Sequence, residues 1–329
     1  MTEYLERGGS KGRIVAAFAA VYIIWGSTYL GIRFAIETIP PFLMAGTRFL
    51  IAGSVLYAWM RLRGTPGPTR EQWKSATIIG ALLLLIGNGG VTWAEQIVSS
   101  SITALLIATT PLWFVMLDWM GGSRTKPNAG IIAGLVVGTL GVLLLIGPWE
   151  STNEHSISLI GMAVLMVATI AWAAGSLYSK KTELPASPLM STAMQMLAGG
   201  ALLMIVGFAA GEERRLNPET FSFLSVASLL YLTVFGSLIA FSAYVWLLRV
   251  ASASRVATYA YVNPVIAVIL GWAFAGEELT LRTMIAAAVI IVGVVLIINN
   301  QSRGKTKPVA LQQEPIHHER EPLAAGETR

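Results

Sequence analysis

Two charged side chains occupy positions where the sequence is otherwise strongly apolar. Arg48 lies within the apolar stretch 42–61, and Glu95 ends the stretch 75–95. If such stretches cross a membrane, a charge like Arg48 costs about 2.5–3.5 kcal/mol and should face the protein interior. Glu95 could act as a proton-coupling carboxylate whose proton affinity Arg48 modulates. A structural ion pair between the two is the alternative, which we favour because Glu95 lies near the expected membrane surface.

Uncharged polar and aromatic residues inside apolar stretches form a second group of candidates. Asn88 stands between two glycines; its amide needs a partner at that depth, and the glycines permit close backbone approach or local unwinding. Trp25 and Trp172 stand midway along their stretches, away from the interfacial position typical of anchoring tryptophans. Tyr244 adds a hydroxyl that can donate. Such rings bind flat or cationic ligands, so we interpret all four as cavity candidates, with helix packing as the alternative.

Two prolines stand in the middle of apolar stretches. Pro111 lies in the fourth stretch and Pro264 in the ninth. Proline removes a backbone donor and clashes with the preceding turn, which predicts a kink or an unwound turn at each position. The polar neighbours Thr110, Tyr261 and Asn263 would then line a cavity together with the freed carbonyls. A purely structural kink is the alternative.

The composition argues against an enzyme. The chain is 54% hydrophobic and 12% charged, whereas soluble domains average about 25% charged residues. It has no cysteine, and its three histidines lie outside the apolar stretches. Acid–base or metal chemistry needs clustered titratable groups, so we predict no catalytic residue, no metal site and no cofactor. There is no Walker-type phosphate-binding motif, so ATP is not expected to drive this chain.

Ten apolar stretches are long enough to cross a bilayer, which takes roughly 20 residues each. The sequence therefore predicts an all-α polytopic membrane protein with ten transmembrane helices. The expected spans are 14–34, 42–61, 75–95, 102–120, 129–147, 157–178, 189–210, 223–248, 256–275 and 281–299. The polar ends, residues 1–13 and 303–329, are expected to be tails, and the proline-containing C-terminal tail is predicted to be disordered.

The basic residues predict the orientation of the chain. Eighteen Lys and Arg residues fall in the tails and the loops on one side, and four fall on the other side. Basic residues accumulate on the cytoplasmic side of membrane proteins, so both termini are expected in the cytoplasm. The net charge of +5 then reflects membrane topology and does not indicate a nucleic-acid partner.

Scarce residues recur at two nearly equal offsets. The pairs are Trp25 with Trp172, Pro41 with Pro188, Trp93 with Trp246, Pro111 with Pro264 and Trp119 with Trp272. Such matches indicate a duplication, with halves at 14–147 and 157–299. Five spans in each half force the second half to enter the membrane in the opposite orientation. Inverted repeats are typical of alternating-access transporters, which bind the solute between the halves.

Several segments together resemble a known family. They are Trp25–Tyr29, Pro40–Phe49, Gly87–Gly89 with Ala94 and Glu95, Thr110 with Pro111, and Tyr259–Pro264. These segments resemble the EamA-type members of the drug/metabolite transporter superfamily, over about residues 14–299. The resemblance implies ten helices in two inverted EamA repeats, a bacterial cytoplasmic (inner) membrane, and export of small metabolites or amino-acid-like compounds.

We therefore predict a secondary transporter that exports small organic metabolites, amino-acid-like compounds or drugs by alternating access, with proton coupling left open. An uncoupled facilitator or an importer is the alternative, and an intramembrane enzyme or a sensor is disfavoured. The expected partners are a small-molecule substrate and the lipid bilayer, with no nucleic acid. Gly130, Gly134 and Gly138 have a spacing that lets helices approach closely, within the chain or between two copies, so the protein is expected to be a monomer or a homodimer.

Overall fold

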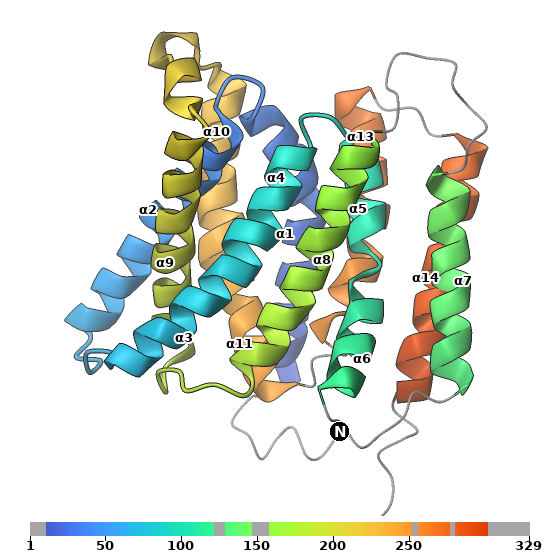
Figure 1. The fold of residues 1–329 in the computed structure, drawn as a ribbon, viewed down its shortest axis with the longest axis horizontal. Coiled ribbons are helices and arrows are strands. Elements are labelled where there is room, and N and C mark those ends of the chain that lie inside the picture. The colour runs from blue at the N-terminus through green and yellow to red at the C-terminus, as the bar shows by residue number, and fades with distance from the viewer. Residues whose placement is uncertain (1–10, 122–128, 147–157, 252–255, 277–279, 302–329) are drawn as a thin grey trace, which may run out of the picture.

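The structure, a computed structural model, describes residues 11–121, 129–146, 158–251, 256–276 and 280–301. Every regular element in these ranges is helical (Figure 1). The longer elements are α1 (Lys11–Ala35), α2 (Pro41–Leu62), α3 (Arg70–Gly80), α6 (Thr110–Met120), α7 (Ala129–Ile146), α8 (Leu159–Ser179), α9 (Pro188–Ala209), α13 (Tyr259–Ala275) and α14 (Leu281–Gln301). The expected tails fall almost entirely outside the described residues.

Seven helices in the described ranges are long and apolar enough to cross a membrane. They are Gly12–Ala35, Pro41–Leu62, Arg70–Ala94, Ile102–Met120, Leu159–Ser179, Pro188–Ala209 and Phe223–Val250. These seven match the first four and the sixth to eighth expected spans. The other three expected spans contain shorter apolar helices, Ala129–Gly141, Val262–Ala275 and Met284–Gly293. The all-helical membrane class is confirmed.

The third long helix of each half changes its winding in the middle. The π-helical segment η2 (Ala81–Gly89) lies between α3 and α4 (Gly90–Ala94). The π-helical segment η5 (Leu232–Phe241) lies between α10 (Phe223–Tyr231) and α11 (Ser242–Val250). Wide turns of this kind concentrate at functional sites because they redirect side chains and free backbone groups. The sequence analysis allowed local unwinding at the glycines beside Asn88 in the first of these spans and expected the second to be uninterrupted.

The two prolines have different effects on their helices. The fourth span is divided into α5 (Ser100–Ile107) and α6, which begins just before Pro111. The predicted interruption is therefore confirmed in this span. In contrast, α13 continues through Pro264 without an unwound turn. The turn at residues 257–258 precedes α13, so the interruption of this span lies before the helix begins at Tyr259, and Pro264 stands inside a regular helix.

The helices α2 and α9 pack along each other with closely spaced backbones. A Cβ at Gly53 would lie 3.0 Å from the backbone nitrogen of Leu197, and a Cβ at Gly200 would lie 3.0 Å from that of Leu50. Both helices start with a proline in the first turn, which is favourable because that position needs no amide donor. This contact holds the helix that carries Arg48 against the second half.

The helices α7 and α14 lie side by side at one edge of the bundle (Figure 1). A Cβ at Gly293 of α14 would lie 2.7 Å from the carbonyl oxygen of Gly134 and would collide with the backbone nitrogen of Gly138. The glycine ladder of α7 thus serves the intramolecular packing of this pair. This is the first of the two interpretations that the sequence left open for it.

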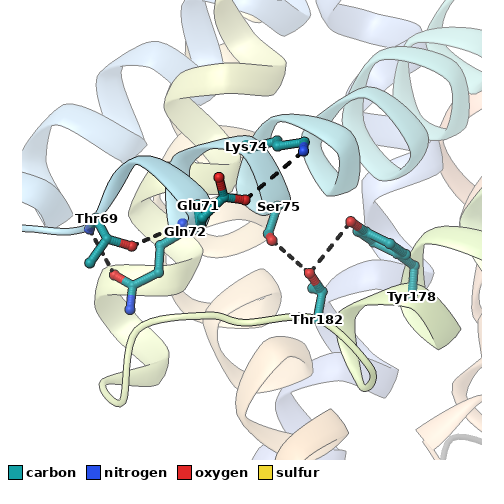
Figure 2. Close-up of polar contacts among 7 residues, drawn as sticks. All are labelled: Thr69, Glu71, Gln72, Lys74, Ser75, Tyr178 and Thr182. Atoms are coloured by element: carbon teal, nitrogen blue, oxygen red, sulfur yellow. Dashed lines mark hydrogen bonds and ion pairs between the residues drawn. The ribbon is translucent and has the colours of Figure 1, made fainter.

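Local polar contacts fix the start of α3 (Figure 2). Thr69 Oγ1 accepts from the Gln72 backbone nitrogen at 3.2 Å, and Gln72 Oε1 accepts from the Thr69 nitrogen at 3.1 Å. This reciprocal pair is a capping box, which satisfies two amides at a helix start. One turn further on, the hydroxyls of Ser75 and Thr182 form a hydrogen bond of 2.6 Å, which joins α3 to the segment after α8.

A distant carboxylate caps the start of α2. Glu212 belongs to the short helix η3 (Glu212–Arg215) that follows α9. Its Oε1 accepts from the Phe42 nitrogen at 3.2 Å and its Oε2 from the Leu43 nitrogen at 2.9 Å. The residue before the helix, Pro40, makes no side-chain cap. A negative charge at this end satisfies free amides and interacts favourably with the helix dipole.

Candidate functional site

A narrow cavity lies between helices of both halves, and the centre of a water-sized sphere can reach about 60 Å³ of it. The first half contributes Trp25, Thr28, Tyr29, Ile32, Arg48, Phe49, Leu84, Gly87, Asn88, Val91, Ile107 and Thr110. The second half contributes Ala168, Thr169, Trp172, Gly236, Phe241, Tyr259 and Asn263. Both π-helical segments and both edges of the break before α6 therefore reach this cavity. The walls are mostly apolar and carry a few polar groups, as is usual for sites that bind small molecules.

Aromatic rings from both halves pack together beside the cavity. Trp25 of α1 meets Trp172 of α8 edge to face, with ring centroids 5.5 Å apart. Trp25 also lies 4.9 Å from Tyr244 and 5.0 Å from Tyr259, centroid to centroid. Phe241 completes this aromatic cluster at 6.5 Å from Trp25. Tyr244 is fully buried and does not line the cavity. It contacts both tryptophans and therefore supports their rings.

Hydrogen bonds fix both tryptophans. Trp25 Nε1 donates to the Gly236 carbonyl at 3.2 Å. Trp172 Nε1 donates to the Tyr244 hydroxyl at 2.9 Å. The Trp172 ring packs against Gly87 so closely that a Cβ there would lie 2.9 Å from ring atom Cε3. Satisfied indole donors and tight contacts hold the rings in defined positions, as a binding surface requires.

Arg48 is almost completely buried, with 2% of its surface exposed, and it lines the cavity. Its Nε donates to Ser237 Oγ at 2.7 Å, and its Cζ lies 4.6 Å from the centre of the Phe49 ring. Gly236 leaves room for the guanidinium, since a Cβ there would lie 3.0 Å from Nη2. The Nη1 atom is buried without a hydrogen-bond partner. All recorded contacts of the guanidinium are thus with uncharged groups.

The ion pair between Arg48 and Glu95 that the sequence favoured is not formed in this structure. The segment η5 lies against α2, so the guanidinium meets Ser237 across the interface between the halves. Glu95 is 2% exposed and is not among the side chains that line the cavity. Asn88 does line the cavity, and its Oδ1 is buried without a hydrogen-bond partner.

The break before α6 is stabilised by a hydroxyl. Pro111 has no amide to bond the Ile107 carbonyl four residues earlier. Thr110 Oγ1 donates to that carbonyl at 2.5 Å instead. Thr110 also lines the cavity, whereas Pro111 is buried just outside it. The freed carbonyl predicted from the proline therefore exists, and its partner is the neighbouring side chain.

On α13, as around Pro111, the polar candidate lines the cavity and the proline does not. Asn263 is 1% exposed and lines the cavity. With its amide turned so that the nitrogen faces the backbone, it donates to the carbonyls of Tyr259 at 3.0 Å and Tyr22 at 3.1 Å. Pro264 is buried inside α13 and is not a lining residue. Tyr261 belongs to α13, but its side chain lies outside the described part of the structure.

Sequence reasoning did not single out the residues that hold Arg48 and Trp25 in place. Gly236 and Ser237 perform this task, and Phe241 and Thr169 add to the walls. One sequence signal could have pointed to them, because each third span carries a glycine next to a polar residue, Gly87-Asn88 and Gly236-Ser237.

The chemistry available in the cavity is that of non-covalent recognition. Aromatic faces can stack on a flat solute, and amide, hydroxyl and guanidinium groups can donate hydrogen bonds to it. Within the described ranges, no group of three or more His, Cys, Asp or Glu side chains is arranged to hold a metal ion. A helical membrane protein with a cavity between its two halves has the architecture that is typical of secondary transporters.

Sequence comparison identifies the family. The model of the EamA-like transporter family matches residues 12–147 and again residues 159–299. The protein therefore belongs to the EamA-like transporter family, and the resemblance noted from its motifs is confirmed.

The relatives have the same character. The chain is 40% identical over 297 residues to a protein named uncharacterized inner membrane transporter YedA of Escherichia coli K12, with 90% of this chain and 94% of that one covered. It is 24% identical to the uncharacterized transporter YoaV of Bacillus subtilis, with 86% and 95% covered. A solved crystal structure matches with a TM-score of 0.64 and 18% identity, over 90% of this chain and all of that chain, which supports the fold alone. Membrane transport of small molecules is the function that these relationships support.

Proposed function

We propose that the protein exports small organic metabolites, amino-acid-like compounds or drugs as a secondary transporter in a bacterial inner membrane. Its ten helices would form two inverted five-helix halves, with both termini in the cytoplasm. Rocking of one half against the other would open the cavity to alternate sides of the membrane.

The cavity itself carries this proposal. Its wall takes Trp25, Arg48 and Asn88 from the first half and Trp172 and Asn263 from the second. A solute that touches both walls would bind best when the halves are closed around it, and their separation would release it. Transporters with inverted repeats bind their solutes at this kind of interface.

Each candidate then has a distinct role. Trp25 and Trp172 would contact the flat part of the solute, while Asn88, Thr110 and Asn263 would orient it through hydrogen bonds. Other candidates would act on the walls from behind. Tyr244 would position Trp172, Pro111 and Pro264 would shape their helices, and the side chain of Tyr261 remains a candidate from the sequence alone.

The first experiment compares the small molecules released by a strain that lacks the gene with those released by a strain that overproduces the protein. We expect at least one solute to accumulate outside the overproducing cells and inside the deleted ones. The variant Trp25→Leu should abolish the difference, whereas Trp119→Leu should not, because Trp119 is half exposed and lies outside the cavity. If no solute changes in either strain, export is refuted.

Coupling and direction need a second experiment in proteoliposomes. With the solute identified, efflux is measured with and without a pH gradient for the wild type and for Glu95→Gln. Loss of the gradient response in the variant would assign proton coupling to Glu95, and an unchanged response would remove Glu95 from the mechanism. Transport that ignores every gradient would favour the alternative of a facilitator. Reporter fusions at both termini would test the orientation.

A further inference from the structure

We propose that the cavity recognises its solute through a carboxylate that Arg48 binds, so that the transported compound is an organic monoanion. This inference rests on the proposed function, because it names the substrate class of the same cavity. Three features support it: the unpaired edge of the guanidinium, the charge of the walls, and the aromatic cluster.

The guanidinium of Arg48 is bonded at one edge and unpaired at another. Its Nε is used by Ser237, while Nη1 is buried without a partner and the residue lines the cavity. The end-on edge formed by Nη1 and Nη2 therefore carries no recorded hydrogen bond. Two parallel N–H groups on such an edge match the two oxygens of a carboxylate, which makes this pairing both strong and geometrically specific.

The charge of the walls points in the same direction. Among the residues that line the cavity, Arg48 is the charged one, and no carboxylate is present. The position 147 residues later, which is its counterpart in the repeat, is the neutral Gln195. A buried charge is costly unless it is paired. A solute that brings its own negative charge supplies the counter-ion that is missing among the lining residues.

The walls favour one negative charge over two. A doubly charged phosphate group would need further cationic partners, and the lining contains none besides Arg48. The start of α6 adds little positive charge, because Pro111 carries no amide hydrogen and the Leu112 amide already donates to the Thr109 carbonyl at 2.9 Å. A single guanidinium suits a carboxylate.

The rest of the solute would lie against the aromatic cluster. Trp25, Trp172 and Phe241 line the cavity, and aromatic rings suit a flat apolar group. Asn88 has an unpaired buried oxygen, and its amide can accept from or donate to a hydroxyl or amide of the solute. The inferred compound is thus a carboxylate with a flat apolar body and few further charges.

The experiment measures binding of a probe panel to the purified full-length protein in detergent. Each aromatic or aliphatic monocarboxylate is paired with its neutral amide and with the corresponding amine, for example phenylacetate, phenylacetamide and phenylethylammonium. Binding is followed by thermal stabilisation and by tryptophan fluorescence. We expect the carboxylates that bind to do so at least about tenfold more tightly than their amides, since charge-assisted hydrogen bonds are worth about that factor or more.

Variants then locate the effect. Arg48→Met should remove the preference for the carboxylate, and Arg48→Lys should retain part of it, because lysine keeps the charge and loses the paired N–H groups. Arg63→Met is the matched control, since Arg63 ends the same helix and is exposed. Should Arg48→Met fail to fold, Ser237→Ala provides a second test, as it removes the side chain that holds Nε and should weaken carboxylate binding without changing the charge.

Three results would overturn the inference. They are equal binding of carboxylates and amides, unchanged binding by Arg48→Met, and no stabilisation by any carboxylate of the panel. The proposed function would survive each of them if export of a neutral or cationic solute were measured. Conversely, carboxylate binding that depends on Arg48 in a protein that transports nothing would support this inference and refute export.

Discussion

The contact between Glu212 and the start of α2 gives the sharpest prediction about stability. Removing the carboxylate should weaken the protein, because its two oxygens accept from the amides of Phe42 and Leu43. These amides have no partner in the preceding turn of the same helix. The contact also joins the end of the second half's α9 to the first half's α2, so its loss should loosen the two halves at this end.

The structure allows the magnitude to be worked out. Glu212 is 5% exposed, so water cannot readily replace the carboxylate. A hydrogen bond to a charged group contributes about 1.5–3 kcal/mol, and removing a helix cap costs about 1 kcal/mol and up to about 2 kcal/mol. Glu212→Gln retains one neutral acceptor and should cost about 1.5–3 kcal/mol, whereas Glu212→Ala leaves two amides unpaired and should cost about 2–4 kcal/mol.

The assay is thermal unfolding of the purified protein in one fixed detergent. For a large domain, 1 kcal/mol corresponds to about 2 °C or somewhat more, so Glu212→Gln should unfold roughly 3–6 °C below the wild type. Glu213→Gln is the matched control. That neighbour carries the same charge, but its side chain is 40% exposed and pairs with Arg214 at 3.7 Å, an arrangement that contributes little to stability.

The comparison of the two variants decides the matter. If Glu212→Gln and Glu213→Gln unfold at the same temperature, the cap does not stabilise the protein and the reasoning is wrong. The same conclusion would follow if Glu212→Ala were no less stable than Glu212→Gln. A loss confined to the first variant would support the cap independently of any transport activity.

Three further predictions concern packing and polar contacts, each measured as a shift of the unfolding temperature in detergent. Gly293→Ala should cost about 1–3 kcal/mol, because the added methyl meets the backbone of α7. The control Gly138→Ala should be neutral or slightly stabilising, because a Cβ there meets nothing within 4 Å. Equal shifts of the unfolding temperature in the two variants would contradict this packing. Tyr244→Phe should cost about 1–3 kcal/mol, because it leaves the Trp172 donor unpaired, and it should also red-shift or broaden the tryptophan emission. An unchanged unfolding temperature together with an unchanged emission would refute the supporting role of the hydroxyl. Thr110→Val should cost a similar amount, because the Ile107 carbonyl at the end of α5 loses its donor. A double variant that also carries Pro111→Ala supplies a backbone amide to that carbonyl. If it unfolds at a higher temperature than Thr110→Val alone, the cause is confirmed.

The sequence was informative where a local property decides the outcome. Long apolar runs with few charges predict membrane helices because each residue's transfer energy depends mainly on its own side chain. The same reasoning predicted that Arg48 would face the interior, and it is buried there. The repeated Trp25 and Trp172 were predicted to lie at corresponding depths, and the structure brings them into contact.

Local patterns were less informative about backbone detail. Proline predicted an interruption at Pro111, which is present, and one at Pro264, where the helix continues. The π-helical segments contain no proline, and only the glycines beside Asn88 had indicated local unwinding in the first of them. Whether a turn widens depends on the neighbouring helices that pack against it, and this information is spread over the whole chain.

By itself the sequence determined the class of protein, the family, most of the membrane helices and the short set of polar residues that have to be buried. The tertiary structure decided which partners these residues meet. Arg48 bonds Ser237, 189 positions away, and Glu212 caps a helix that begins 171 positions earlier. Hydropathy acts residue by residue and is therefore legible in one sequence, whereas a hydrogen bond between distant segments depends on how all the helices pack at once.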